Sequence, residues 1–177
     1  MSTEKFQTNP FDHLKEQVAL AIGQSCETSD GAAAKVVAFV SSRAYKGVEP
    51  GVDLVDSLND LVRGTIQEAV RLGCDLKPIT KGLVLGTFRA RGFVRLEAHK
   101  VITHLVGLVV TDVADAGGDV GRAVAGFMEG IAQSAPEMKL NKEEALFEAA
   151  NAVLAKATEA GPKFLEAVRQ KLKGHNI

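Results

Sequence analysis

Apolar residues recur at every third or fourth position along most of the chain. Between Asp53 and Gly73 they occupy positions 54, 58, 61, 62, 66, 69 and 70, with charged and amide residues between them. This spacing follows the 3.6-residue period of an amphipathic helix. No stretch alternates apolar and polar residues in the way a half-buried strand does. The pattern therefore predicts an all-α fold.

Start and stop signals divide the chain into about eight expected helices. Asp, Ser or Asn at the N-cap, proline in the first turn and glycine after the last turn mark most of the ends. The helices are expected over 10–27, 32–45, 53–73, 75–91, 94–116, 119–134, 141–161 and 162–174. Residues 1–9 are expected to be a flexible tail, and 47–51 and 135–141 are expected to be loops.

The helix stops repeat at a fixed interval. Gly73, Gly117 and Gly161 are 44 residues apart, and residues 61–86 align with residues 105–130. This predicts one all-α domain over 1–177, built from four helix–turn–helix units at about 10–47, 52–91, 93–134 and 141–174. The first and last units match less well. Both a short solenoid and a compact bundle fit this periodicity.

Pairs of small residues four positions apart recur in the second helix of the first three units. The pairs are Ala38 and Ser42, Gly82 and Gly86, and Gly126 and Gly130. Glycine inside a helix costs about 0.5–1 kcal/mol relative to alanine, so a compensating role is expected. Residues four apart share one helix face. These pairs are therefore predicted to let another helix approach closely, within the chain or in a partner.

The expected helix over 94–116 is unusually apolar. From Val101 to Val113 it carries apolar residues on almost every side. A helix that is apolar all round has to be buried all round. Two arrangements satisfy this: the helix is the central element of the domain, or a partner subunit or lipid covers part of it.

Composition limits the location and the partners. The formal net charge of −1 gives no general attraction to nucleic acid, which is therefore an unlikely partner. The N-terminus has no apolar signal segment, and the longest apolar stretch, 101–110, is half the length of a membrane span. The protein is expected in the cytoplasm, with peripheral attachment at a membrane as an open alternative.

The sequence offers no pattern for catalysis, cofactor binding or metal binding. His99 and His104 are five residues apart, and 117–126 is glycine-rich but lacks the Gly-Lys-Ser/Thr ending of a phosphate loop. Asp112, with the acidic residues 115 and 119, is expected on a solvated face. Cys26 and Cys74 are expected to be free, small buried residues. We therefore expect no catalytic, cofactor-binding or metal-binding residue, no cofactor and no enzymatic activity.

Basic residues concentrate at the turn between the second and third units. Arg89, Arg91 and Arg95 form the densest part of this run. One interpretation is contact with an anionic partner, such as anionic lipid or an acidic protein. The other is a solvated corner in which arginine side chains face the carbonyl groups at a helix C-terminus.

These features favour a non-enzymatic scaffold or interaction protein. It is predicted to self-associate as a homo-oligomer, or to dock on another protein or an apolar surface, through its small-residue helix faces. Two alternatives stay open: a carrier of a hydrophobic small molecule such as a lipid or quinone, and a peripheral membrane-associated protein. In size, alanine-rich helical content and absence of tryptophan the chain resembles phasin-type granule-coating proteins, a similarity of composition that implies no site residue.

Overall fold

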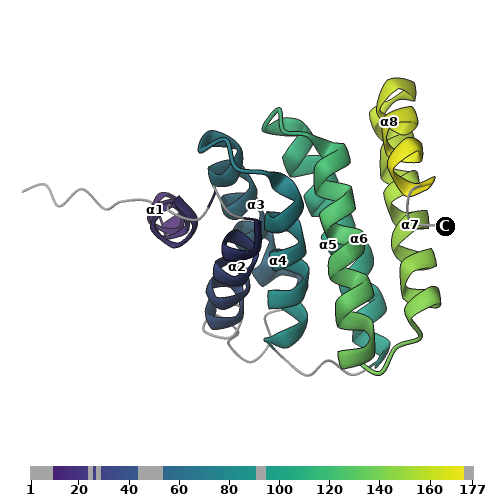
Figure 1. Cartoon of the computed structure of the whole chain (residues 1–177), viewed down its shortest axis with the longest axis horizontal. Helices are drawn as coiled ribbons and strands as arrows, with labels where there is room; N and C mark the ends of the chain where they lie inside the picture. Colours follow the sequence, from purple (N-terminus) through teal and green to yellow (C-terminus); the bar gives the residue numbers. More distant parts are fainter. Residues whose placement is uncertain (1–9, 24–25, 27–28, 44–53, 91–94, 174–177) are drawn as a thin grey trace, which may run out of the picture.

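The computed structural model describes residues 10–23, 26, 29–43, 54–90 and 95–173, and these fold into eight helices without a strand (Figure 1). The all-α prediction is confirmed. The helices are α1 (Pro10–Ile22), α2 (Ser29–Arg43), α3 (Leu54–Arg71), α4 (Leu76–Arg89), α5 (Arg95–Asp115), α6 (Val120–Glu137), α7 (Lys142–Ala160) and α8 (Pro162–Lys173). The expected tail over 1–9 and the expected linker over 47–51 lie outside the described residues.

Local sequence signals set most of the helix ends. The side chains of Asp75, Asp119 and Asn141 accept hydrogen bonds from backbone N–H groups two or three residues later, as N-cap residues do. Gly73 and Gly117 follow α3 and α5 with φ of 71° and 73°. Glycine adopts this left-handed conformation without the steric cost that a Cβ brings. The two central turns therefore have the same construction.

Several helix ends differ from those expected. α1 ends at Ile22, α2 begins at Ser29 rather than at 32, and α6 continues to Glu137 although 135–141 was expected to be a loop. Pro136 fits in the last turn of α6, and the backbone N–H of Leu140 donates to the carbonyl of Ala135 at 2.9 Å. Ala135 is fully buried. Burial of this turn outweighs the helix-breaking tendency of proline.

The helices pack in two series, one of odd-numbered and one of even-numbered helices. α1, α3, α5 and α7 each contact the next member of their series, and so do α2, α4 and α6. α8 packs against both α6 and α7. Figure 1 shows the result as a row that follows chain order, from α1 at one end to α7 and α8 at the other. Each helix in the middle of the row is therefore held by the units on both sides.

α5 is the central element of the core. One hydrophobic cluster includes residues of all eight helices, and α5 supplies a large share of it, with eight buried apolar residues from Ala98 to Val113. The chain itself does not bury α5 all round, however. Lys100, Thr103 and Thr111 are exposed, and Gly107 between them is half-buried. A narrow stripe of α5 thus stays open to solvent.

Candidate binding groove

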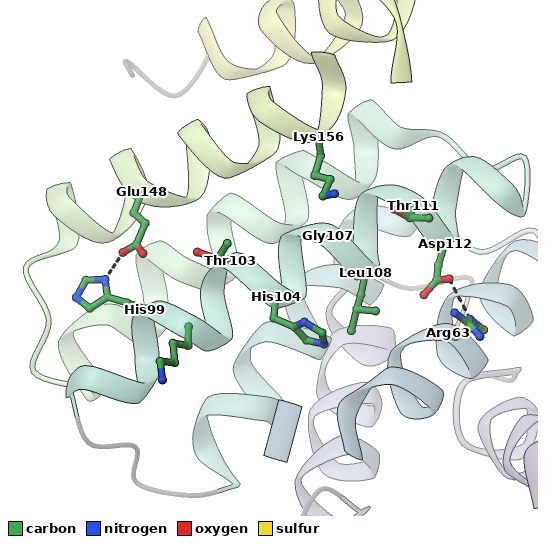
Figure 2. Close-up of a pocket in the computed structure, with 11 residues that line it drawn as sticks. Arg63, His99, Thr103, His104, Gly107, Leu108, Thr111, Asp112, Glu148 and Lys156 are labelled. Carbon is green, nitrogen blue, oxygen red and sulfur yellow. Dashed lines mark hydrogen bonds and ion pairs between the residues drawn. The ribbon is translucent and has the colours of Figure 1, made fainter. Parts of the chain in front are cut away.

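The exposed stripe of α5 is the floor of a groove of about 820 Å³, which we call the α5 groove. α3 and α7 flank this floor and contribute the residues of its two sides (Figure 2). The groove is lined by Arg63, His99, Lys100, Thr103, His104, Gly107, Leu108, Thr111, Asp112, Glu148 and Lys156. Its volume lies within the range of about 300–1,000 Å³ that is common for ligand sites.

The floor is low because its residues are small. Thr103, Gly107 and Thr111 are four positions apart, so they share one face of α5. A Cβ added at Gly107 would meet only the Lys156 side chain, 3.6 Å away at Cε. That is ordinary van der Waals distance. Packing within the chain therefore does not require glycine at this position.

Polar contacts tie the floor to both sides. His104 Nε2 lies 2.7 Å from Oδ1 of Asn59 in α3, and His99 Nδ1 contacts the carboxylate of Glu148 in α7. The two histidines thus reach opposite sides of the groove, as their five-residue spacing implies. These contacts join α3 and α7 to opposite sides of α5.

Asp112 lies at one end of the α5 groove and has one oxygen without a partner. Its Oδ1 accepts a hydrogen bond from Arg63 Nε at 3.2 Å, whereas Oδ2 is buried and has no hydrogen-bond partner among the described residues. The side chain is only 5% exposed, so the expected solvated position is wrong. Burial raises the pKa of this carboxyl group, Arg63 opposes the shift, and Asp115 adds to it.

Positive charge lines the rim of the groove. Lys100 is exposed and has no ion-pair partner in the part of the chain that the structure describes. Lys156 pairs with Glu159 on its own helix at 2.8 Å, a contact between exposed groups. The side chain of Arg63 is 48% exposed although its Nε is bound to Asp112. Among the described residues Lys100 thus carries the unpaired charge of the rim, whereas Arg63 and Lys156 are partly exposed but already paired.

The predicted glycine pairs lie where helices of the same chain cross. In α4, a Cβ at Gly82 would lie 2.8 Å from the carbonyl oxygen of Ala33, and a Cβ at Gly86 would lie 2.8 Å from Cβ of Val40 in α2. Real Cβ atoms essentially never approach other atoms so closely. The Ser41 hydroxyl also donates to the Gly86 carbonyl at 3.3 Å. Both glycines therefore allow close contact between α4 and α2.

The second pair does the same one unit later. In α6, a Cβ at Gly126 would lie 1.9 Å from the carbonyl oxygen of Lys77, and a Cβ at Gly130 would lie 2.7 Å from Cβ of Val84. Both neighbours belong to α4. Since helices of this chain already fill all four positions, these glycines cannot also receive a partner helix.

The first small pair is not part of this packing. Ala38 and Ser42 are exposed on α2, and the Ser42 hydroxyl donates to the Phe39 carbonyl of its own helix at 2.8 Å. In α2 the buried face toward α4 is formed instead by residues such as Val36 and Val40. The close approach here is provided by glycine on α4 alone, so α2 needs no small pair.

The basic turn is only partly available to an anionic partner. Arg89 forms two hydrogen bonds with Glu137 of α6, at 3.0 and 2.8 Å, so its charge is used within the chain. This bidentate pair lowers the pKa of Glu137. Arg91 lies outside the described residues, and Arg95 is the first residue of α5 with a side chain that is not described.

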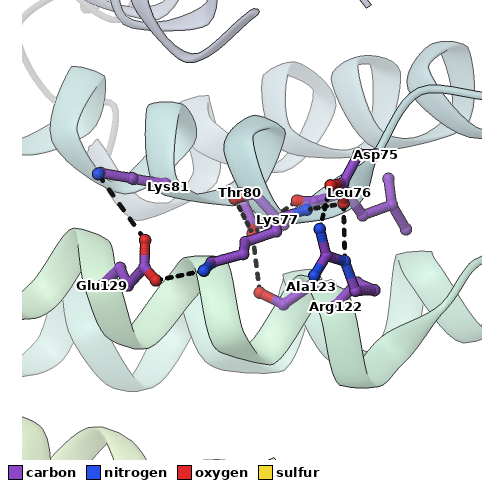
Figure 3. A network of polar contacts seen from close by, with 8 residues as sticks. All are labelled: Asp75, Leu76, Lys77, Thr80, Lys81, Arg122, Ala123 and Glu129. Atoms are coloured by element: carbon purple, nitrogen blue, oxygen red, sulfur yellow. Dashed lines mark hydrogen bonds and ion pairs between the residues drawn. The ribbon is translucent and has the colours of Figure 1, made fainter. Parts of the chain in front are cut away.

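A smaller polar hollow of about 230 Å³ lies beside the contact of α4 with α6, where charges are paired with one another (Figure 3). Arg122 Nε donates to Asp75 Oδ1 at 3.0 Å, and this hydrogen bond is the main reason that the pKa of Asp75 is lowered. The ammonium groups of Lys77 and Lys81 lie 2.5 and 3.8 Å from the Glu129 carboxylate. This hollow fastens two helices and offers less unpaired charge than the α5 groove.

Cys26 and Cys74 form a disulfide, which corrects the expectation of two free thiols. Their Cα atoms are 4.9 Å apart, and the bond joins Cys26, which lies between α1 and α2, to the turn before α4. The helix ends fold next to each other, although 48 positions separate the two residues in the sequence. Spacing alone contained no signal for this contact.

The groove was missed as a site because His99, His104 and Asp112 were considered separately and the other lining residues are unremarkable in the sequence. The one available signal is the series Lys100, Thr103, Gly107 and Thr111, which interrupts an otherwise apolar helix at intervals of three and four. That series marks the single exposed face of α5. Arg63 and Lys156, on the two sides of the groove, come from α3 and α7, and no pattern in the sequence distinguishes them.

Comparisons with known proteins add no family. The chain matches no family model, and no curated protein matches it. Within the described residues, no group of three or more potential ligands could hold a metal ion. Among the described helices, none is both long and apolar enough to cross a bilayer.

Proposed function

We propose that this protein is a non-enzymatic interaction protein that binds a polypeptide partner along the α5 groove. The observation that carries the proposal is Gly107. A glycine in the middle of α5 costs helix stability, and its missing side chain serves no close contact in the chain. Its effect is to keep the floor of the groove low. A binding surface explains why α5 contains this glycine, since no close packing within the described chain offsets the helix stability that it costs.

We also infer that the scaffold is a helical repeat of about 44 residues. Asp75 and Asp119 are separated by one repeat length, and each is an N-cap directly after a glycine-containing turn. The contacts of α2 with α4 and of α4 with α6 give further support. In repeat proteins each unit contacts its neighbours, and the surface along one layer binds the partner. The α5 groove lies along such a layer.

We assign no partner contact to the close-packing glycines Gly82, Gly86, Gly126 and Gly130. A homo-oligomer remains part of the proposal only through other surfaces. Light scattering of the purified protein measures it directly: a defined multiple of 18.7 kDa supports self-association, and the monomer mass contradicts it.

The carrier and membrane alternatives gain less support. The α5 groove carries charged residues of both signs, which suits a polar chain better than a lipid or a quinone. The Arg89 charge that favoured a membrane surface is paired with Glu137. A cytoplasmic location stays a prediction, and the Cys26–Cys74 disulfide bears on it, since such bonds persist mainly in oxidising compartments.

Affinity capture with matched variants tests the proposed function. Gly107→Leu places a side chain on the floor of the groove, whereas Lys163→Leu alters an exposed residue of α8. We expect a partner that binds the wild type and Lys163→Leu, is lost with Gly107→Leu, and binds the purified protein directly. Equal capture by all three proteins would contradict the proposal.

A further inference from the structure

The α5 groove has the length of a short extended peptide. From His99 to Asp112 the floor spans thirteen helical steps, or about 20 Å at 1.5 Å per residue. An extended chain of about six residues covers the same distance. The floor is a single helix wide, between α3 and α7. An α-helix is about 10–12 Å across with its side chains, so an extended segment suits this width better.

Charge pairing differs between the two sides of the molecule. At the contact of α4 with α6, each described basic side chain that reaches the other helix faces an acidic group. Along the α5 groove, Lys100 has no such partner among the described residues, and Arg63 is half-exposed. Glu148 is already bound to His99. An acidic group of a ligand would complete the pairing of Lys100, whereas Lys156 already pairs with Glu159 and Arg63 with Asp112.

The unpartnered oxygen of Asp112 adds a second requirement. Oδ2 is buried at the end of the groove and, while the carboxyl group is ionised, can only accept a hydrogen bond. Leaving such a group without a donor costs free energy. An extended backbone exposes N–H groups along its edge, as in strands that add to a sheet edge. Because Oδ2 is buried, one of these groups can donate to it only when neighbouring side chains move aside.

We propose that the α5 groove binds an extended acidic polypeptide segment, with a backbone N–H donating to Asp112 Oδ2 and acidic side chains facing Lys100, Lys156 and Arg63. This inference rests on the proposed function and specifies the chemistry of its partner. Alternate side chains of the segment point away from the floor toward the basic rim, and those between them lie on Gly107 and the flanking threonines.

Three fluorescein-labelled peptides of ~8 residues, long enough to span the floor, probe this chemistry. They alternate Val with Glu, Gln or Lys. Fluorescence anisotropy is expected to show the strongest binding for the Glu–Val peptide, weaker binding for the Gln–Val peptide and the weakest for the Lys–Val peptide. Added salt should weaken the Glu–Val complex most, because its contacts are between charges.

Lys100→Glu tests the basic rim. Lys100 has no partner in the described chain, so the substitution leaves the fold intact, and we expect affinity for the Glu–Val peptide to fall about fivefold or more. Lys163→Glu makes the same charge change on α8, away from the groove, and should leave the affinity nearly unchanged.

Asp112→Asn distinguishes the contribution of the proposed hydrogen bond to peptide affinity from the contribution of the negative charge. The substitution removes a negative charge from the groove, so electrostatics alone predicts tighter binding of an acidic peptide. The hydrogen bond predicts weaker binding, since an amide N–H₂ directed at the ligand cannot accept from its backbone. Tighter binding by Asp112→Asn would overturn the assigned contact.

Gly107→Leu separates failure of this inference from failure of the proposed function. If the Gln–Val or Lys–Val peptide binds as tightly as the Glu–Val peptide and Gly107→Leu abolishes that binding, the groove binds polypeptides but the acidic class is wrong. If Gly107→Leu leaves Glu–Val binding unchanged, or no peptide binds the wild type, both proposals fail. Selective Glu–Val binding that Gly107→Leu removes supports both.

Discussion

A Cβ on Gly126 would lie 1.9 Å from the carbonyl oxygen of Lys77, closer than a Cβ on any other described glycine would come to a neighbouring atom. At this point α6 meets the backbone of α4 rather than a side chain. Backbone in a helix cannot move aside as a side-chain tip can. The contact between these two residues therefore fixes the distance between α4 and α6.

Gly126→Ala should destabilise the protein by about 1–3 kcal/mol or more, since the methyl group forces α4 and α6 apart. Gly130→Ala should cost less, because its Cβ would lie 2.7 Å from Cβ of Val84, a smaller overlap than the 1.9 Å at Gly126. Urea unfolding followed by circular dichroism measures both. Equal stability of Gly126→Ala and the wild type would show that the helices are not packed this closely.

Thr80→Val should also weaken the contact of α4 with α6. The buried Thr80 hydroxyl lies 2.7 Å from the carbonyl oxygen of Ala123 across the interface. Valine keeps the shape and removes the donor, which costs about 0.5–1.5 kcal/mol. Thr87→Val is the control, because its buried hydroxyl donates only to Leu83 of its own helix. If the two variants unfold at the same urea concentration, the interhelical bond contributes nothing measurable.

The sequence was sufficient for the fold class and most helix ends, because capping residues and glycine stops act locally. Asp75 and Asp119 illustrate this, since each N-cap function follows from the residue and its position. It was not sufficient for contacts between distant elements. The Cys26–Cys74 bond and the Arg63–Asp112 pair depend on how units pack, which local periodicity does not encode.

The candidate site shows the same limit. Glycine pairs could be recognised as packing positions, but their partners within the chain could not, and self-association was favoured for that reason. Gly107 was passed over because it stands alone in the sequence. Only its neighbours in space distinguish it from Gly126: it faces open space and a flexible lysine, whereas Gly126 faces backbone.

Reduction of the Cys26–Cys74 disulfide should lower the free energy of unfolding by about 2–4 kcal/mol, because the bond closes a long loop in the unfolded chain. Thermal unfolding with and without reductant measures the effect. The double variant Cys26→Ala with Cys74→Ala should melt at the temperature of the reduced wild type and ignore reductant. A wild type that is equally indifferent to reductant would contradict the bond.

Acid should remove the contribution of the Asp75–Arg122 pair. The pKa of Asp75 is lowered in the folded state, so its contribution is present above the ordinary carboxylate pKa and is lost as pH falls through the lowered value. Both side chains are partly exposed, which limits the contribution to about 1 kcal/mol. Arg122→Gln should therefore be less stable than wild type at pH 7, and the difference should shrink as the pH falls toward 2.

Arg169→Gln, on the exposed face of α8, is the control for this pH series. It should follow the wild type at both pH values. A deficit in Arg122→Gln that persists unchanged at pH 2 would assign its effect to packing rather than to the ion pair.

We propose that Gly107 keeps a binding groove open at the expense of helix stability, and one urea titration of Gly107→Ala, with and without the Glu–Val peptide, tests this claim. Without peptide, the variant should be more stable than wild type by about 0.5–1 kcal/mol, because alanine favours the helix and meets only the Lys156 side chain. With peptide, wild type should gain stability through binding, and the variant should gain less. A variant that is less stable than wild type, or that gains as much from the peptide, would contradict the claim.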